Sequence, residues 1–182
     1  MKSPKEMTIK ELVWEFRMER RGDKIGTFYP PSDPQRRDEL MERMKAQKPE
    51  IMQYLIDQEN QKARAAQDRQ EKIDAIPGLA ELEAAIEDIS KWDEEFERNW
   101  ERGDSGVGLR PRPQYDLDAM RAEYPRAAAY LAAESMSLSP NYIKASAGQK
   151  ALNKIINGED HVQALADAKA EWDAYVQEHI WD

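Results

Sequence analysis

The strongest constraint on the fold is a polar stretch in the middle of the chain, residues 57–75, which reads DQENQKARAAQDRQEKIDA. Its charged, amide and alanine side chains favour a helix by intrinsic propensity. Such a helix has no wide apolar stripe to bury, and helices of this kind usually bridge two domains in solvent. Pro77 and Gly78 follow the stretch and are expected to end the helix. The stretch therefore predicts two lobes joined by a helix.

The segments on either side of this stretch have mostly helical patterns. We predict a mainly α fold with two helical lobes joined by a long polar helix, and at most a small β element near residues 24–30. The predicted domains are a small N-terminal α(+β) domain at residues 1–57, a helical connector at 58–76 and a C-terminal helical domain at 77–182. No stretch of the chain approaches 18 consecutive apolar residues, so no membrane-spanning helix is expected.

In the N-terminal domain, Thr8 followed by Glu11 forms a capping-box pattern. This pattern predicts a helix, which Gly22 is expected to end. Residues 24–29, with the sequence KIGTFY, are aromatic and β-branched and predict a strand or one arm of a hairpin. Another helix follows, and Pro49 in the first turn of the next one predicts where that helix begins.

The C-terminal domain begins with an amphipathic pattern from Leu79 to Arg102. Three more helices are predicted: one from Pro125, one from Pro140 that ends at Gly158, and one capped by Asp160. The expected inner positions of the last helix are Val162, Leu165, Ala166, Trp172, Val176 and Ile180. The tryptophans expected to serve chiefly as core are Trp14, Trp92, Trp100, Trp172 and Trp181.

The chain is acidic, with a formal net charge of −9, and the acidity is concentrated between Glu81 and Asp104. One interpretation is a solvated helix face. The other is a surface that imitates the phosphates of a nucleic acid and binds a cationic channel. The candidate partner-binding residues on this helix are Glu83, Glu87, Asp88, Glu94, Glu95, Glu97 and Glu101.

A loop with the sequence GDSGVGLRPRP follows this helix. It has three glycines but lacks the Gly-Lys-Ser/Thr ending of a phosphate-binding P-loop. Arg110 and Arg112 alternate with prolines, which favours an extended segment. Such a segment could present two guanidinium groups to a partner, or it could be an ordinary loop between domains.

The residue types needed for chemistry are scarce. There is no cysteine, so disulfides are impossible, and only two histidines are present, His161 and His179. We identify no catalytic, metal-binding or cofactor-binding residues, and we expect no enzyme activity. The first residues, MKSPKEMTIKEL, lack the apolar region of a secretory signal, so a cytoplasmic protein is expected.

Two stretches resemble known families. The run from IKELVW to EIMQYL resembles small helix–hairpin–helix–helix docking domains. The residues that carry this likeness are Leu40, Lys48, Pro49, Glu50, Ile51, Tyr54 and Leu55. Residues 76–182, with the words GVGLRPRP, YPRAAAYL, ALNKIINGED and EWDAYVQEHIWD, are similar to proteins carried by phages and mobile elements of gut Clostridia. A small, acidic, cysteine-free chain of this kind also resembles anti-CRISPR inhibitors of type II effectors.

The second resemblance implies a non-enzymatic inhibitor in the cytoplasm of a bacterial host. It would bind a guide-RNA-loaded type II CRISPR effector nuclease and block target DNA binding or cleavage, partly by acidic mimicry of DNA. Two alternatives stay open. The chain could be a phage accessory or regulatory protein that binds DNA or a DNA-metabolism protein. It could also be a docking module whose N-terminal lobe recruits another chain. The basic residues that favour DNA binding are Arg20, Arg21, Lys24, Arg36, Arg37, Arg110 and Arg112.

Overall fold

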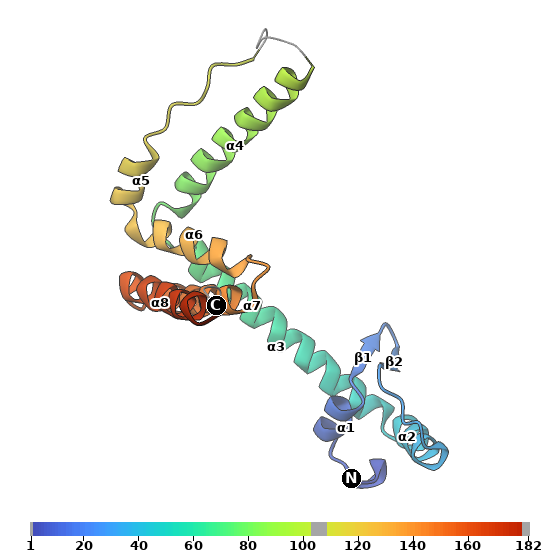
Figure 1. The fold of residues 1–182 in the computed structure, drawn as a ribbon. Coiled ribbons are helices and arrows are strands. Elements are labelled where there is room, and N and C mark those ends of the chain that lie inside the picture. The colour runs from blue at the N-terminus through green and yellow to red at the C-terminus, as the bar shows by residue number, and fades with distance from the viewer. Residues whose placement is uncertain (1, 103–108, 180–182) are drawn as a thin grey trace. The chain divides into compact units, whose positions relative to one another are not determined.

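The structure is a computed structural model that describes residues 2–102 and 109–179. Within these residues the protein has eight α-helices and one two-stranded sheet, which confirms the mainly α fold (Figure 1). The chain divides into two compact units, Met1–Asp68 and Arg69–Asp182. The boundary falls inside the long helix α3 (Lys48–Asp74), which both units share. No helix in the described part of the chain has the length and apolar character needed to cross a bilayer.

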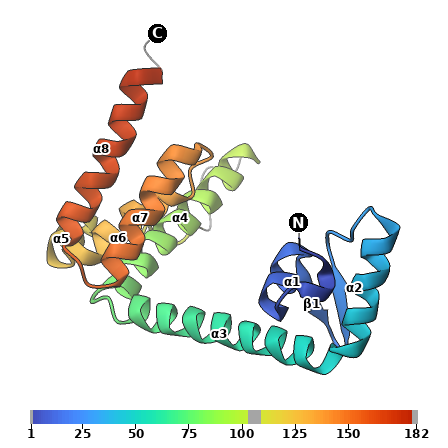
Figure 2. The ribbon, with the colours of Figure 1, turned by 90° about the horizontal axis from the view of Figure 1, so that it is seen from below.

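Unit 1 is built around the first turns of α3. A short 3-10 helix (Pro4–Glu6) precedes α1 (Ile9–Glu15), strands β1 (Met18–Arg21) and β2 (Lys24–Thr27), and α2 (Pro34–Ala46). Figure 2 shows α1, β1 and α2 gathered beside the start of α3. The apolar side chains that these elements bury together are Met7, Leu12, Val13, Phe16, Met18, Leu40, Ile51 and Leu55. Burial of this cluster is the main source of stability for the unit.

The start of α1 confirms the predicted capping box. The Glu11 amide donates to Thr8 Oγ1 over 3.2 Å, and the Thr8 amide donates to Glu11 Oε2 over 2.8 Å. Two amide donors that the helix leaves without intrahelical partners are therefore satisfied.

The prediction that the first helix continues to Gly22 is wrong for its second half. Helix α1 ends at Glu15, and β1 pairs antiparallel with β2 so that Met18 lies opposite Thr27. The chain leaves the helix through Arg17, whose φ of 46° is left-handed and costs an L-residue about 1 kcal/mol. Burial of Met18 and the pairing with β2 offset this cost. Strand β2 lies where the small β element was predicted.

Besides the end of α3, unit 2 contains α4 (Leu79–Glu101), α5 (Leu117–Glu123), α6 (Pro125–Ser137), α7 (Tyr142–Ile156) and α8 (His161–His179). Helices α6, α7 and α8 form the core, and the short α5 was not predicted. Much of this core consists of small side chains, namely Ala127, Ala129, Ala133, Ala147, Gly148, Ala151, Ala164 and Ala168. Small residues allow helix backbones to approach closely, so these helices pack tightly without large side chains between them.

The predictions that Gly158 ends α7 and that Asp160 caps α8 are confirmed. Gly158 adopts φ 86° directly after the C-cap, where its amide donates to the Ile155 carbonyl over 3.1 Å. The next amide donates back to Lys154, which completes a Schellman motif. Asp160 accepts hydrogen bonds from the first amides of α8.

Two predictions about the core are only partly right: Leu165 and Trp172 pack against it, but other expected residues do not. On α8, Ala164 and Ala168 are buried, whereas Val162 is 66% exposed and Ala166 is exposed. The most buried positions of the helix are alanines, which allow its backbone to approach the neighbouring helices closely. Of the tryptophans expected in the core, Trp14 and Trp100 are each 71% exposed. Leu165, Trp92, Trp172 and Val176 are half-buried, and Ile180 and Trp181 lie outside the described residues.

Candidate protein-binding surface of helix α4

Helix α4 has two different halves. Its first half buries Leu79, Leu82 and Ala85 against the core of unit 2. Its second half extends away from α6, α7 and α8, and the chain that leads into α5 returns alongside it (Figure 1). The apolar stripe of the first half continues into the second at steps of three and four residues. There it consists of Ile89, Trp92, Phe96 and Trp100.

The aromatic members of this stripe form a ladder, which we define as Trp92, Phe96 and Trp100. The centroids of Trp92 and Phe96 are 5.2 Å apart, and those of Phe96 and Trp100 are 6.3 Å apart. Exposure rises along the ladder, with Phe96 at 40% and Trp100 at 71%. Aromatic side chains that are held in place and left exposed are suited to anchoring a partner protein.

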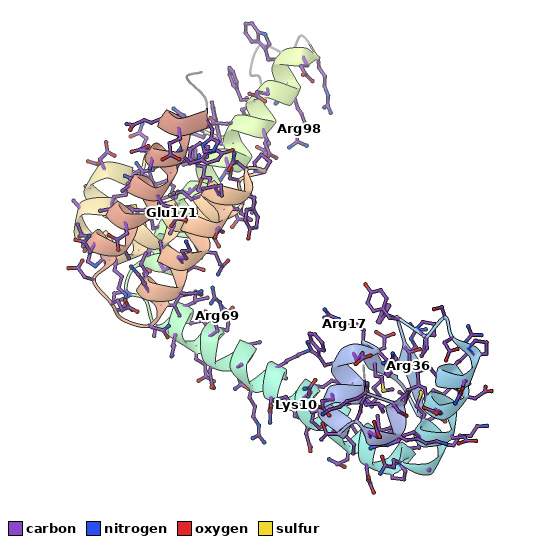
Figure 3. The ribbon with its side chains drawn as sticks, turned by 60° about the horizontal axis from the view of Figure 1, so that its bottom comes forward. Lys10, Arg17, Arg36, Arg69, Arg98 and Glu171 are labelled. Atoms are coloured by element: carbon purple, nitrogen blue, oxygen red, sulfur yellow. The ribbon has the colours of Figure 1, made fainter. Side chains whose placement is uncertain are left out.

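The seven acidic candidates on α4 divide between two faces. Glu83, Glu87, Glu94, Glu97 and Glu101 follow one another at steps of three, four or seven residues, so they share one face. Asp88 and Glu95 lie on another face, and the cations Lys91 and Arg98 lie between the two faces, four residues after Glu87 and Glu94. Arg98 lies near the end of α4 (Figure 3). The first face therefore carries most of the acidic candidates, and the two cations lie along one of its borders.

Most carboxylates on the acidic face are unneutralised. Glu94, Glu97 and Glu101 are exposed and form no ion pair with any side chain in the described part of the protein. Glu87 pairs with Lys91 one turn further along. We call Glu87, Glu94, Glu97 and Glu101 the acidic strip. Because Trp100 is one helical turn from Glu97, the aromatic ladder borders this strip.

A shallow hollow lies between the strip and α5. It encloses about 380 Å³, with Ile86, Ile89 and Leu117 as its apolar lining. The polar lining residues are Ser90, Asp93, Glu94 and Glu97. A side chain with an apolar stem and a cationic end, such as lysine or arginine, matches this combination.

Glu83 has a different environment from the rest of its face. It lies where α4 meets the core, and although its side chain is exposed, desolvation there raises the pKa of its carboxyl group. The nearby carboxylates of Glu134 and Asp74 raise this pKa further. Glu83 therefore lies beside other carboxylates at the start of the helix, and we leave it out of the acidic strip.

We expect Glu83→Gln to raise the free energy of unfolding at pH 7. A carboxyl pKa that is higher in the folded state contributes stability below its unfolded value and loses it as pH rises through the folded value. The gain in the variant should therefore disappear near pH 4. Urea midpoints measured across this pH range test the expectation. Glu87→Gln is the matched control, since its carboxylate has a cationic partner in Lys91 and should show no gain.

Arg110 and Arg112 lie against α4. Arg110 Nη2 is 2.7 Å from Asp88 Oδ1, and the Trp92 indole N–H donates to the Arg110 carbonyl over 2.8 Å. Arg112 lies over the Trp92 ring, 5.6 Å from its centroid, and pairs with Asp93 over 3.3 Å. These contacts hold the returning chain on α4 and engage both guanidinium groups within the unit. The sequence does not reveal them, because Asp88 and Asp93 are distant along the chain.

Several arginines that suggested DNA binding in the sequence also form ion pairs with glutamate side chains. Arg20 contacts Glu59 over 2.8 Å, and Arg21 and Arg36 form ion pairs with Glu19 and Glu15. A guanidinium that already has a carboxylate partner must give up that pairing to bind a phosphate. This arrangement weakens the case for direct DNA binding.

The described residues contain no cluster of three potential metal ligands. His161 follows the cap of α8, and His179 stacks on Tyr175 at the end of that helix, with centroids 4.5 Å apart. The glycines at residues 103–108, which suggested a phosphate loop, lie outside the described residues.

Comparison of the chain with family models, curated proteins and solved structures found no match. The resemblances to docking domains and to anti-CRISPR inhibitors therefore stay predictions.

Proposed function

We propose that the protein is a non-enzymatic binding protein that inhibits an RNA-guided nuclease, with the α4 surface as its contact. The acidic strip would occupy a cationic channel that otherwise holds target DNA. The observation that supports this proposal most is the run of exposed, unpaired carboxylates at Glu94, Glu97 and Glu101 beside the exposed ring of Trp100.

The number of carboxylates on the acidic strip limits how much DNA the strip can replace in a cationic channel. From Glu87 to Glu101 an α-helix rises about 21 Å, at about 1.5 Å per residue. One strand of DNA carries about six phosphates over that length, and a duplex about twice as many. The strip has four carboxylates over this length, one of them paired with Lys91, so its charge is nearer to that of a single strand than to that of a duplex. We infer that the strip competes with one DNA strand, whereas the ladder supplies affinity through apolar contact.

Effector nucleases of this class hold nucleic acid in positively charged channels and read a short duplex motif with arginines. Such a channel offers both the cations that the strip needs and the long stems that fit the hollow beside it. The alternative, an accessory protein that binds DNA itself, receives less support because Arg20, Arg21, Arg36, Arg110 and Arg112 have acidic partners.

Binding to immobilised guide-loaded type II effectors in the absence of target DNA tests the proposal. We expect binding that weakens as salt concentration rises and that target duplex displaces. Failure to bind any of several effectors, together with a mobility shift of duplex DNA, would instead support the accessory protein.

A further inference from the structure

Unit 1 has a groove with an apolar lining and cations at its edge, in contrast to the acidic surface of α4. It lies among α1, the hairpin and the first half of α3, and encloses about 670 Å³. Its apolar lining comes from Val13, Trp14, Met18 and Phe28. Val13 and Met18 are buried, whereas Trp14 is 71% and Phe28 59% exposed. Two large rings are therefore available to an occupant at the surface of the groove.

The charged groups around this groove are mainly cationic and unpaired. Lys10, Arg17 and Lys62 line it, and none of them forms an ion pair with another described residue. Lys10 and Arg17 come from α1 and the turn that follows it (Figure 3). Among the described lining residues the single carboxylate is Glu11, which is held by Lys2 over 2.6 Å. The groove therefore favours an anionic occupant.

The walls of the groove are tied together by polar contacts. Arg20 Nε and Nη2 both donate to Glu59 Oε2, over 3.0 Å and 2.8 Å, and this joins β1 to α3. On α3 itself, the Gln58 amide donates to the Tyr54 hydroxyl over 2.9 Å. These contacts hold the groove in shape without using the three cations at its edge.

Arg17 occupies a backbone position that suits glycine better. It directly follows the C-cap residue Phe16, where left-handed φ is common and glycine is the usual residue. Its guanidinium lies 5.8 Å from the centroid of Trp14. A strained residue beside a groove is an observation from which a functional role can be inferred.

We propose that this groove binds an acidic peptide segment of a partner protein that carries at least one large apolar side chain. The apolar side chain would contact Trp14 and Phe28, while its carboxylates pair with Lys10, Arg17 and Lys62. A peptide is favoured over a nucleic acid because Val13 and Met18, which are buried, give the groove an aliphatic lining that matches an apolar side chain. A short acidic peptide can place such a side chain there while its carboxylates reach the three cations, whereas a phosphate backbone offers no apolar group for that lining. This inference is independent of the function proposed for α4.

The test uses the full chain and a labelled synthetic peptide of alternating Asp and Phe, followed by fluorescence anisotropy. We expect saturable binding, about tenfold or more tighter than that of alternating Lys and Phe or alternating Asp and Ala. An oligo-dT strand should bind more weakly than the Asp–Phe peptide. Absence of saturable binding, equal binding of the Lys–Phe peptide, or tighter binding of oligo-dT would each overturn the proposal.

Two variants in the groove and one control variant distinguish a loss of peptide binding from a loss of folding. Arg17→Gly relieves the left-handed strain, so its unfolding midpoint should be unchanged or higher. Its affinity for the Asp–Phe peptide should nevertheless fall about threefold. Trp14→Ala should lower affinity about tenfold. Arg64→Ala, an exposed cation on α3 that does not line the groove, should bind like the parent. Unchanged affinity in both Arg17→Gly and Trp14→Ala would contradict the assignment.

Discussion

Reversing Glu94, Glu97 and Glu101 to lysine together is expected to weaken binding to a guide-loaded effector by about 100-fold or more. Each reversal removes an attraction to the cationic channel and adds a repulsion in its place. Close charge pairs across a protein interface can contribute about 1.5 kcal/mol each, roughly a tenfold effect apiece. The three side chains are exposed and unpaired among the described residues, so the helix itself should remain folded. Titration of the immobilised effector measures the loss, and far-UV circular dichroism checks the fold.

A control variant distinguishes the strip from overall charge. Glu159, Asp173 and Glu178 are exposed acids on α8 and in the turn before it, and none of them lines the hollow beside α4. Reversing these three to lysine changes the net charge by the same amount, yet it should leave affinity within about threefold of the parent. Equal losses in both triple variants would show that long-range charge, not the α4 surface, governs binding.

Gly148→Ala is expected to lower the free energy of unfolding of unit 2 by about 2 kcal/mol. A Cβ atom at this position would lie 2.4 Å from the Ser137 backbone nitrogen and 2.7 Å from the Ala133 carbonyl oxygen. Both contacts are to the backbone of α6, which cannot move aside as a side chain can. Overpacking of this kind costs about 3 kcal/mol. The higher helix propensity of alanine returns about 1 kcal/mol, so the clash outweighs it.

Urea unfolding and amide exchange across α6 and α7 measure this effect. Gln149→Ala, the adjacent exposed position on α7, is the matched control and should change stability by no more than about 0.5 kcal/mol. An unchanged or higher midpoint for Gly148→Ala would mean that α6 and α7 do not approach each other as closely as the structure shows.

Features that depend on a few neighbouring residues could be predicted from the sequence. The capping box of Thr8 and Glu11, the left-handed Gly158 and the cap at Asp160 each involve groups within one or two helical turns. The polar composition of residues 57–75 likewise predicted the helix that the two units share.

Features that depend on residues far apart in the chain could not be predicted from the sequence. Strand β1 consists of Met-Glu-Arg-Arg, which has little intrinsic strand preference and forms because β2 pairs with it. Gly148 interrupts a helical pattern, and only the path of α6 explains it. The exposure of Trp14 also depends on the tertiary structure. An aromatic residue at helical spacing is equally compatible with a position in the core and with an exposed anchor at the surface.

The candidate site was predictable in part. The sequence located the acids on α4, and helical spacing places five of the seven on one face. The engagement of Arg110 with Asp88 and Trp92 required the structure, because it joins residues from opposite sides of the loop. The sequence alone also could not show that Glu83 lies near the carboxylates of Glu134 and Asp74, which separates it from the acidic strip.

The most direct test of the central claim is DNA cleavage by a guide-loaded type II effector, with the protein added before or after target DNA. If the acidic strip of α4 competes with a DNA strand, the protein inhibits cleavage when it is added first. It then has little effect once target DNA is bound. Equal inhibition in both orders would contradict competition for the DNA channel, and absence of inhibition across several effectors would contradict the proposed function.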